Sequence, residues 1–180
     1  MKKSVLNSSD ILGALETGRI KRYSSGIYYA PKRGKLGESV LEPTKILSAK
    51  YMQDREGEQI GYWSGATLDN MIGLSTQVPN VLEIVSNNTS IPQRSIDING
   101  KQKCILRQAR VPVKNENVEV LQFLDVLTRW KPSAFSAGQI QKLGAFAKGI
   151  SRDELMRNSL AFPQKTTRRL VESEVLGVFA

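Results

Sequence analysis

The sequence predicts an α+β protein in which a small basic unit precedes a mixed β core and a helical C-terminal region. Three observations carry this prediction. Short apolar or alternating runs separated by turn residues fill the middle of the chain, which is typical of strands. After Pro112 the apolar residues recur at helical spacing instead. The 180 residues are 40% hydrophobic and 24% charged, and this is the composition of a folded globular protein.

The first predicted elements are a helix and a hairpin. Ser8 or Ser9 caps the helix, Asp10 lies favourably in its first turn, and Gly18 ends it. The apolar stripe of this helix consists of Ile11, Leu12 and Leu15. Residues 19–23 then alternate, residues 24–26 form a turn, and residues 27–29 return, which predicts a short hairpin with a basic face.

A second helix and the β core are expected next. Pro43 suits the first turn of the second helix. A short strand at 60–63 is followed by a helix over 66–72, which Ser64 caps and Gly73 ends. Further strands are expected at 81–85, 94–98 and 101–107, and the pair Asn99-Gly100 is the turn of a hairpin between the last two.

The remaining chain is predicted to be helical. One apolar face is formed by Val118, Leu121, Leu124 and Leu127, and a second by Ile140, Leu143, Phe146, Ala147 and Ile150. Ser151 and Glu154 match a capping box that opens a helix through Leu160. Pro163 is expected to start the last helix.

Positive charge is concentrated near the N-terminus, where residues 1–35 hold eight Lys or Arg and two acids. A helix, a glycine and a basic hairpin in that order are typical of the last part of a winged helix-turn-helix, in which the helix enters the major groove and the hairpin touches phosphates. Only seven residues precede Ser8, so we expect a partial winged helix over residues 1–38. The expected DNA contacts are Ser8, Ser9, Arg19, Lys21, Arg22, Tyr23, Lys32 and Arg33. The alternative interpretation is a hairpin edge that its charges keep soluble.

A second basic surface is expected in the C-terminal helices. Lys165, Arg168 and Arg169 lie near the start of the last predicted helix, where backbone N–H groups also favour anions. This surface would suit RNA, DNA or an acidic protein partner. A solvated helical face explains the same charges.

The composition argues against several classes of enzyme. The chain has no histidine, which excludes imidazole acid–base chemistry and histidine-ligated zinc, and no acids are paired as in a metal site. The single cysteine, Cys104, excludes an internal disulfide and fits a core position. No apolar run approaches the length of a membrane span. We therefore expect a cytoplasmic protein without enzymatic activity, cofactor, metal or membrane partner.

Three stretches resemble the AbiEi-type antitoxin regulators of type IV toxin–antitoxin, or abortive infection, systems. Residues 18–29 (GRIKRYSSGIYY) resemble the wing of that family, residues 61–79 (GYWSGATLDNMIGLSTQVP) resemble the segment after its winged helix, and residues 162–170 (FPQKTTRRL) resemble its closing helix. The positions that match the central signature are Gly61, Tyr62, Ser64, Gly65, Gly73, Leu74, Thr76 and Gln77. From the residues alone we interpret these positions mainly as scaffold.

The resemblance implies a transcriptional regulator. The N-terminal unit would bind the operator DNA of its own operon, with a homodimer as the expected oligomer. Residues 39–180 would form an α+β antitoxin domain that antagonises a nucleotidyltransferase-type toxin. The alternative function is a protein-interaction module that acts through its C-terminal domain without binding DNA.

Overall fold

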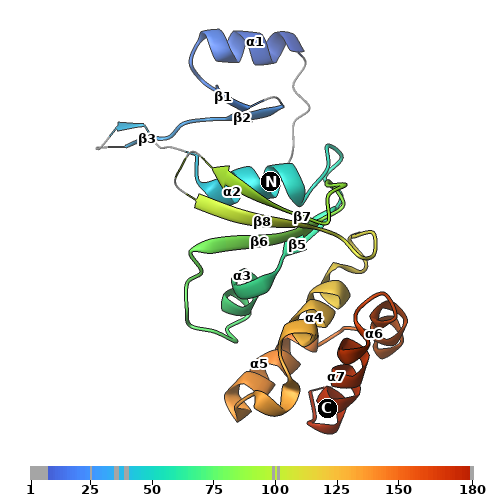
Figure 1. The fold of residues 1–180 in the computed structure, drawn as a ribbon. Helices are drawn as coiled ribbons and strands as arrows, with labels where there is room; N and C mark the ends of the chain where they lie inside the picture. The colour runs from blue at the N-terminus through green and yellow to red at the C-terminus, as the bar shows by residue number, and fades with distance from the viewer. Residues whose placement is uncertain are drawn as a thin grey trace. The chain divides into compact units, whose positions relative to one another are not determined.

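The computed structural model describes residues 8–24, 26–34, 37–38, 41–98, 100 and 102–178. The chain divides into two compact units, Met1–Ala49 and Lys50–Ala180. The domain boundary that the sequence predicts, after residue 38, lies earlier in the chain than the boundary between these two units. The elements mix helices with sheets, so the predicted α+β class is confirmed (Figure 1).

The first unit contains a helix followed by a hairpin. Helix α1 spans Ser8–Glu16, and the chain after it is held to the helix by the Ile20 amide, which donates to the Ala14 carbonyl over 3.2 Å. Strands β1 (Lys21–Ser24) and β2 (Ile27–Tyr29) pair antiparallel, as expected. The short ladder of β3 (Arg33–Gly34) with β4 (Gly37–Glu38) was not expected from the sequence. Helix α2 (Pro43–Tyr51) begins at the predicted proline and spans the division between the units.

The second unit is built on a mixed sheet. Its strands are β5 (Gly61–Trp63), β6 (Val81–Ser86), β7 (Gln93–Ile98) and β8 (Gln102–Gln108). Their order in the sheet is β5-β6-β8-β7, with β6 and β8 parallel and the other neighbours antiparallel. The predicted mixed β core is therefore confirmed. The turn residues Asn99 and Lys101 lie outside the described residues.

Helices cover this sheet and continue beyond it (Figure 1). The helices are α3 (Gly65–Met71), α4 (Val118–Arg129), α5 (Ala137–Ala147), α6 (Arg152–Ser159) and α7 (Gln164–Val175), with a 3₁₀ turn at Pro132–Ala134. Helix α3 packs on β6, and α4 packs on both α3 and β5. Helices α5, α6 and α7 pack around α4, which confirms the predicted helical C-terminal region.

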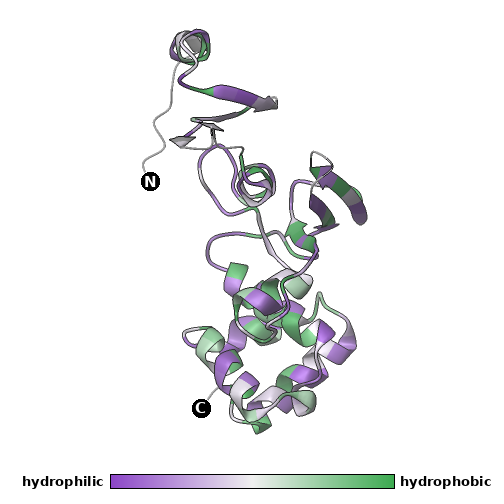
Figure 2. Ribbon diagram, turned by 90° about the vertical axis from the view of Figure 1, so that its left-hand side faces the viewer, coloured by the Kyte–Doolittle hydropathy of each residue, from purple (hydrophilic) through white to green (hydrophobic). Residues whose placement is uncertain are grey.

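The hydrophobic core of the second unit centres on α4. Phe123, Leu124, Val126 and Leu127 are fully buried there, among Leu143 of α5 and residues of α6 and α7. Figure 2 shows hydrophobic and hydrophilic residues alternating in bands along the C-terminal helices, which is the pattern of amphipathic helices packed against one another. Burial on this scale contributes about 1.5–3 kcal/mol for each large apolar side chain. Helix α4 is thereby fixed as the support for the polar residues it presents to α3.

The predicted capping box is wrong in position. Ser151 stands at the N-cap of α6, but its side chain makes no capping hydrogen bond. The capping box forms at α5, where Ser136 Oγ accepts from the Gln139 amide and Gln139 Oε1 accepts from the Ser136 amide. Residues 136–139 and 151–154 both match the residue pattern of a capping box. Local backbone geometry decides which of the two segments forms the pair of reciprocal hydrogen bonds.

Candidate functional site

The basic hairpin of the first unit exposes cations on both sides. Arg19, Lys21 and Arg22 are exposed, and Tyr23 is half-buried. Lys21 pairs in register with Tyr29, and Arg22 pairs with Tyr28. Because successive strand residues point to opposite faces, Lys21 and Arg22 lie on opposite sides of the ladder rather than on one basic face.

The other predicted DNA contacts are spread around this hairpin. Ser9 is exposed in the first turn of α1, and Lys32 is exposed after β2. Ser8 begins α1 and Arg33 begins β3, but their side chains lie outside the described residues. The helix and the hairpin therefore stand together in one unit, as the resemblance leads one to expect.

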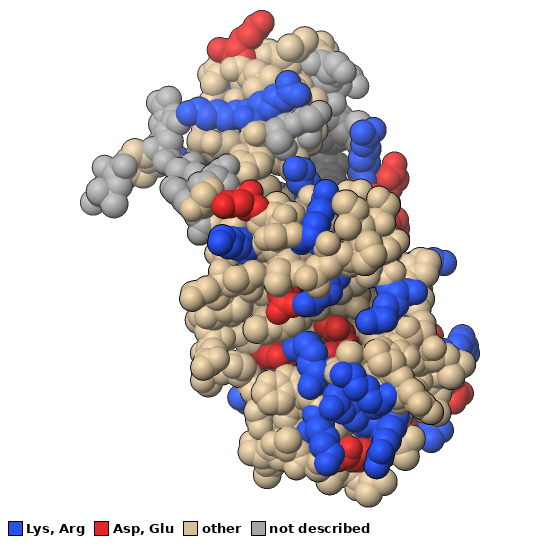
Figure 3. Space-filling view, viewed as in Figure 1, with Lys and Arg blue, Asp and Glu red and all other residues tan. Residues whose placement is uncertain are grey.

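The second predicted basic surface is only partly available to a ligand. Lys165 and Arg168 are exposed on α7, and Figure 3 shows Lys and Arg gathered over the C-terminal helices around an acidic side chain. Arg169 is instead half-buried, and its Nη1 donates to the Leu127 and Thr128 carbonyls over 2.9 and 3.0 Å. It thus satisfies the last carbonyls of α4, which helix ends leave without intrahelical partners.

The start of the signature segment is shaped by close packing. A Cβ atom at Gly61 would overlap the Tyr51 carbonyl oxygen and come within 2.7 Å of the Val85 carbonyl oxygen. Gly65 has φ of 59°, and a Cβ there would overlap the Glu83 carboxylate. These glycines are therefore required by the backbone and by its neighbours, in agreement with the scaffold interpretation.

The end of the signature segment is tied to α5. Gly73 follows α3 with φ of 74°, and its carbonyl accepts from Lys142 Nζ over 2.7 Å. Leu74 is buried in the core, and its carbonyl accepts from Gln139 Nε2 over 2.8 Å. Thr76 and Gln77 are exposed.

The N-terminus of α3 is capped from a neighbouring strand. Ser64 occupies the N-cap position, as predicted, but makes no side-chain capping bond. Glu83 on β6 accepts from the Ala66 amide over 3.2 Å, while its own amide donates to Thr67 Oγ1 over 3.0 Å. Its other carboxylate oxygen accepts from Arg107 Nη1 over 2.6 Å. A strand carboxylate thus takes the role that the sequence assigns to the serine.

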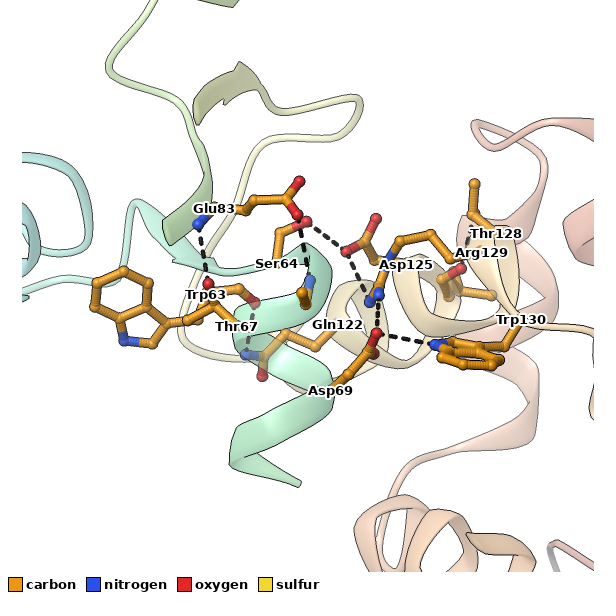
Figure 4. Close-up of polar contacts among 12 residues, drawn as sticks. Trp63, Ser64, Thr67, Asp69, Glu83, Gln122, Asp125, Thr128, Arg129 and Trp130 are labelled. Carbon is orange, nitrogen blue, oxygen red and sulfur yellow. Dashed lines mark hydrogen bonds and ion pairs between the residues drawn. The ribbon is translucent and has the colours of Figure 1, made fainter. Parts of the chain in front are cut away.

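A buried polar cluster joins α3 to α4 (Figure 4). Asp69 Oδ2 accepts from Arg129 Nη1 over 2.5 Å and from Trp130 Nε1 over 2.9 Å. Ser64 Oγ donates to Asp125 Oδ2 over 2.6 Å, and the same carboxylate oxygen lies 3.6 Å from Arg129 Nη2. Asp125 and Arg129 are one turn apart on α4, so one face of that helix meets Ser64 and Asp69 of the signature segment.

The chemistry available to this cluster is that of charge pairing and binding. The cluster pairs Asp69 and Asp125 with the guanidinium of Arg129, and no group of three or more acids or cysteines among the described residues is placed to hold a metal ion. Within the part of the chain that the structure describes, no helix combines the length and the apolar character needed to cross a membrane.

Neither a scan against protein-family models nor a search of curated proteins gives a match to this chain. The case for a function therefore rests on the residues, their charges and their geometry.

Proposed function

We propose that this chain is a DNA-binding regulator of the antitoxin type, in which α1 and the β1–β2 hairpin contact DNA. The observation that carries the proposal is a hairpin with exposed cations directly after a helix, in one compact unit. The resemblance of residues 18–29 and 61–79 to AbiEi-type regulators supports the antitoxin class. The second unit would then act against a nucleotidyltransferase-type toxin.

The distribution of charge supports a nucleic-acid contact through the first unit. Residues 1–49 carry nine Lys or Arg and four acids, whereas residues 50–180 carry 17 and 13. More than half of the net charge of +9 therefore falls in just over a quarter of the chain. Lysine and arginine that neutralise phosphates supply most of the sequence-independent affinity for DNA.

Helix and hairpin suit different parts of a DNA site. The nine residues of α1 span about 13 Å, and they expose Ser9 and Leu12. A serine hydroxyl can bond a base edge, and an apolar side chain can contact the thymine methyl group. Asp10 and Glu16 are also exposed on α1 and would repel phosphates, so we assign the phosphate contacts to the hairpin cations.

The proposal is tested by titrating the full chain against a labelled duplex from upstream of its own gene and against a scrambled duplex. Affinities are measured at about 50 and 200 mM salt, because log K falls with log salt by about 0.9 for each phosphate contact. We expect tighter binding to the upstream duplex, and the stoichiometry shows whether a dimer binds. Arg22→Ala should weaken binding to both duplexes and reduce the salt slope by about one.

Arg55→Ala is the matched control, because Arg55 is also exposed and lies in the second unit. This substitution removes the same charge and should leave the salt slope unchanged. If Arg22→Ala behaves like Arg55→Ala, the hairpin is not part of the DNA contact. Circular dichroism of both variants shows whether the fold is retained.

A second candidate function is an interaction module that acts through the second unit alone. The exposed Lys165 and Arg168 on α7 favour it, because they offer a basic surface to an acidic partner. Weak binding that is equal on both duplexes and vanishes at the higher salt would contradict sequence-dependent regulation and favour this candidate. Lys165→Ala combined with Arg168→Ala should then abolish toxin neutralisation, while Arg22→Ala leaves it intact.

A further inference from the structure

A cavity of about 410 Å³ opens in the second unit between the sheet and α4. Its volume falls within the range of about 300–1,000 Å³ that is usual for small-ligand sites. The polar lining includes Tyr62 from β5, Arg107 from β8, Arg110 from the segment after it, and Asp125 and Arg129 from α4. Elements distant in the sequence thus bring positive groups to one hollow.

The cavity contains hydrogen-bond donors that the described residues do not use. The Tyr62 side chain is buried, and among the described residues its hydroxyl has no hydrogen-bond partner. Nε and Nη2 of Arg129 have no hydrogen-bond partner there either, but both atoms are fully buried behind the cavity wall, with Nη2 3.6 Å from Asp125. Buried donors without acceptors are costly, so their presence around a cavity is informative.

Arg110 adds a charged and flat wall to the same cavity. Its guanidinium carbon lies 5.8 Å from the centre of the Phe162 ring, which also lines the cavity. Among the described residues, no carboxylate forms an ion pair with Arg110. An arginine held over an aromatic ring offers hydrogen-bond donors in a fixed fork and a face on which a planar group can stack.

Arg110 is the lining cation that favours an anion. Arg107 and Arg129 also line the cavity, but they pair with the Glu83 and Asp69 carboxylates. Asp125 is itself compensated, because it accepts from Ser64 and lies beside Arg129 (Figure 4). Burial raises the pKa of Tyr62, with Asp125 adding to the effect, so its hydroxyl stays a donor across the physiological range. Such a set of donors matches the oxygens of a phosphate.

We propose that this cavity binds a phosphate monoester that carries a planar ring, with Tyr62 and Arg110 beside the phosphate and Phe162 beside the ring. A free nucleoside monophosphate and the phosphorylated 5′ end of a nucleic-acid strand share this chemistry. The site lies wholly in the second unit, so it is distinct from the DNA contact proposed for the hairpin.

The test is a calorimetric titration of the full chain with adenosine 5′-monophosphate, with adenosine as the uncharged control. We expect saturable binding of the monophosphate and no measurable binding of adenosine. Arg110→Gln should weaken binding about tenfold or more, because it removes a charged donor. Tyr62→Phe should weaken it by about two- to tenfold, because it removes a neutral hydroxyl and keeps the ring.

Arg157→Gln is the matched control, because Arg157 is exposed on α6 and does not line the cavity. Its binding should equal that of the unmodified chain. No saturable binding of the monophosphate at millimolar concentration, equal binding of adenosine, or equal losses in Arg110→Gln and Arg157→Gln would each overturn the proposal. Unfolding curves confirm that each variant is folded before it is titrated.

Competition with two short single strands, one with a 5′-phosphate and one with a 5′-hydroxyl, identifies the source of the phosphate. Stronger competition by the phosphorylated strand than by the monophosphate assigns the site to a strand end, and the reverse assigns it to a free nucleotide. Both results support the phosphate site, whereas equal competition by the two strands overturns it. Arg22→Ala should leave monophosphate binding unchanged, which separates this site from the hairpin contact.

Discussion

Removing the carboxylate of Asp69 tests whether the cluster between α3 and α4 holds the second unit together. Asp69→Ala deletes the acceptor of two hydrogen bonds, from Arg129 Nη1 and from Trp130 Nε1. The Asp69 side chain is 6% exposed and that of Arg129 is 25% exposed, so water replaces the lost partner only in part. The substitution therefore leaves a largely buried cation without its main counter-charge.

The loss of stability expected for Asp69→Ala lies between the loss on breaking a buried ion pair and the loss on breaking a surface ion pair. Breaking a buried pair from one side costs about 3–5 kcal/mol, and an exposed pair contributes about 0–1 kcal/mol. Arg129 keeps Asp125 at 3.6 Å and is partly solvated, so we expect a loss of about 2–4 kcal/mol in the free energy of unfolding. Asp69→Asn keeps an acceptor for Trp130 without the charge, and it should lose roughly half as much.

Urea unfolding followed by tryptophan fluorescence measures this loss, because Trp63 and Trp130 both lie in the second unit. The control is a double-mutant cycle with Arg129→Met, in which the cation that needs compensation is absent. In that background Asp69→Ala should cost clearly less than it does alone. A loss below about 1 kcal/mol for Asp69→Ala, or an equal loss in both backgrounds, would refute the reasoning.

Two further predictions concern single side chains of the second unit. Arg169→Gln should lower the free energy of unfolding by about 1–3 kcal/mol, because it removes the donor to the Leu127 and Thr128 carbonyls. The control Arg168→Gln should change the stability measured in urea by less than about 0.5 kcal/mol. Equal effects of the two substitutions would contradict the capping role of Arg169. Burial, with the Glu83 carboxylate adding, raises the pKa of Cys104 to about 12. The thiol of the unfolded chain ionises at roughly pH 8.5. The contribution of the neutral Cys104 thiol to the free energy of unfolding is therefore fully present below that pH, and it is lost as pH rises toward the pKa of the folded state. Urea midpoints between about pH 9 and 10 should therefore fall more steeply for the unmodified chain than for Cys104→Ala, and parallel slopes would exclude this linkage.

Sequence reasoning located the elements whose signals are local. Pro43, Gly73 and Pro163 mark helix boundaries in the structure as predicted, because proline and glycine restrict or free their own backbone. The helical spacing of α4 likewise predicted the burial of Leu121, Leu124 and Leu127, whereas Val118 is only half-buried. It missed Val120, Phe123 and Val126, which are buried as well. The β3–β4 ladder was missed because two-residue strands carry no periodicity.

The polar contacts of the candidate site could not be predicted in the same way. Asp69 and Arg129 are 60 positions apart, and Glu83 caps a helix that begins before it in the chain. A single sequence contains the charges but not their pairing, so it predicts Arg169 on a basic surface, although this side chain bonds the end of α4. The one available signal is that Asp69 is the single charged residue of the signature segment 61–79, because a lone charge in a mostly uncharged stretch requires a partner when it is buried.

The scaffold role of the signature segment and the proposed ligand site depend on the same residues of α4. Ser64 and Asp69 hold Asp125 and Arg129, and those two side chains also line the cavity. Asp69→Ala should therefore weaken monophosphate binding as well as lower stability, because it releases the Arg129 side chain that forms part of the cavity wall. Arg110→Gln, which breaks no ion pair, should lower affinity alone. If Asp69→Ala lowers stability and leaves affinity intact, the signature segment supports the fold without positioning the cavity.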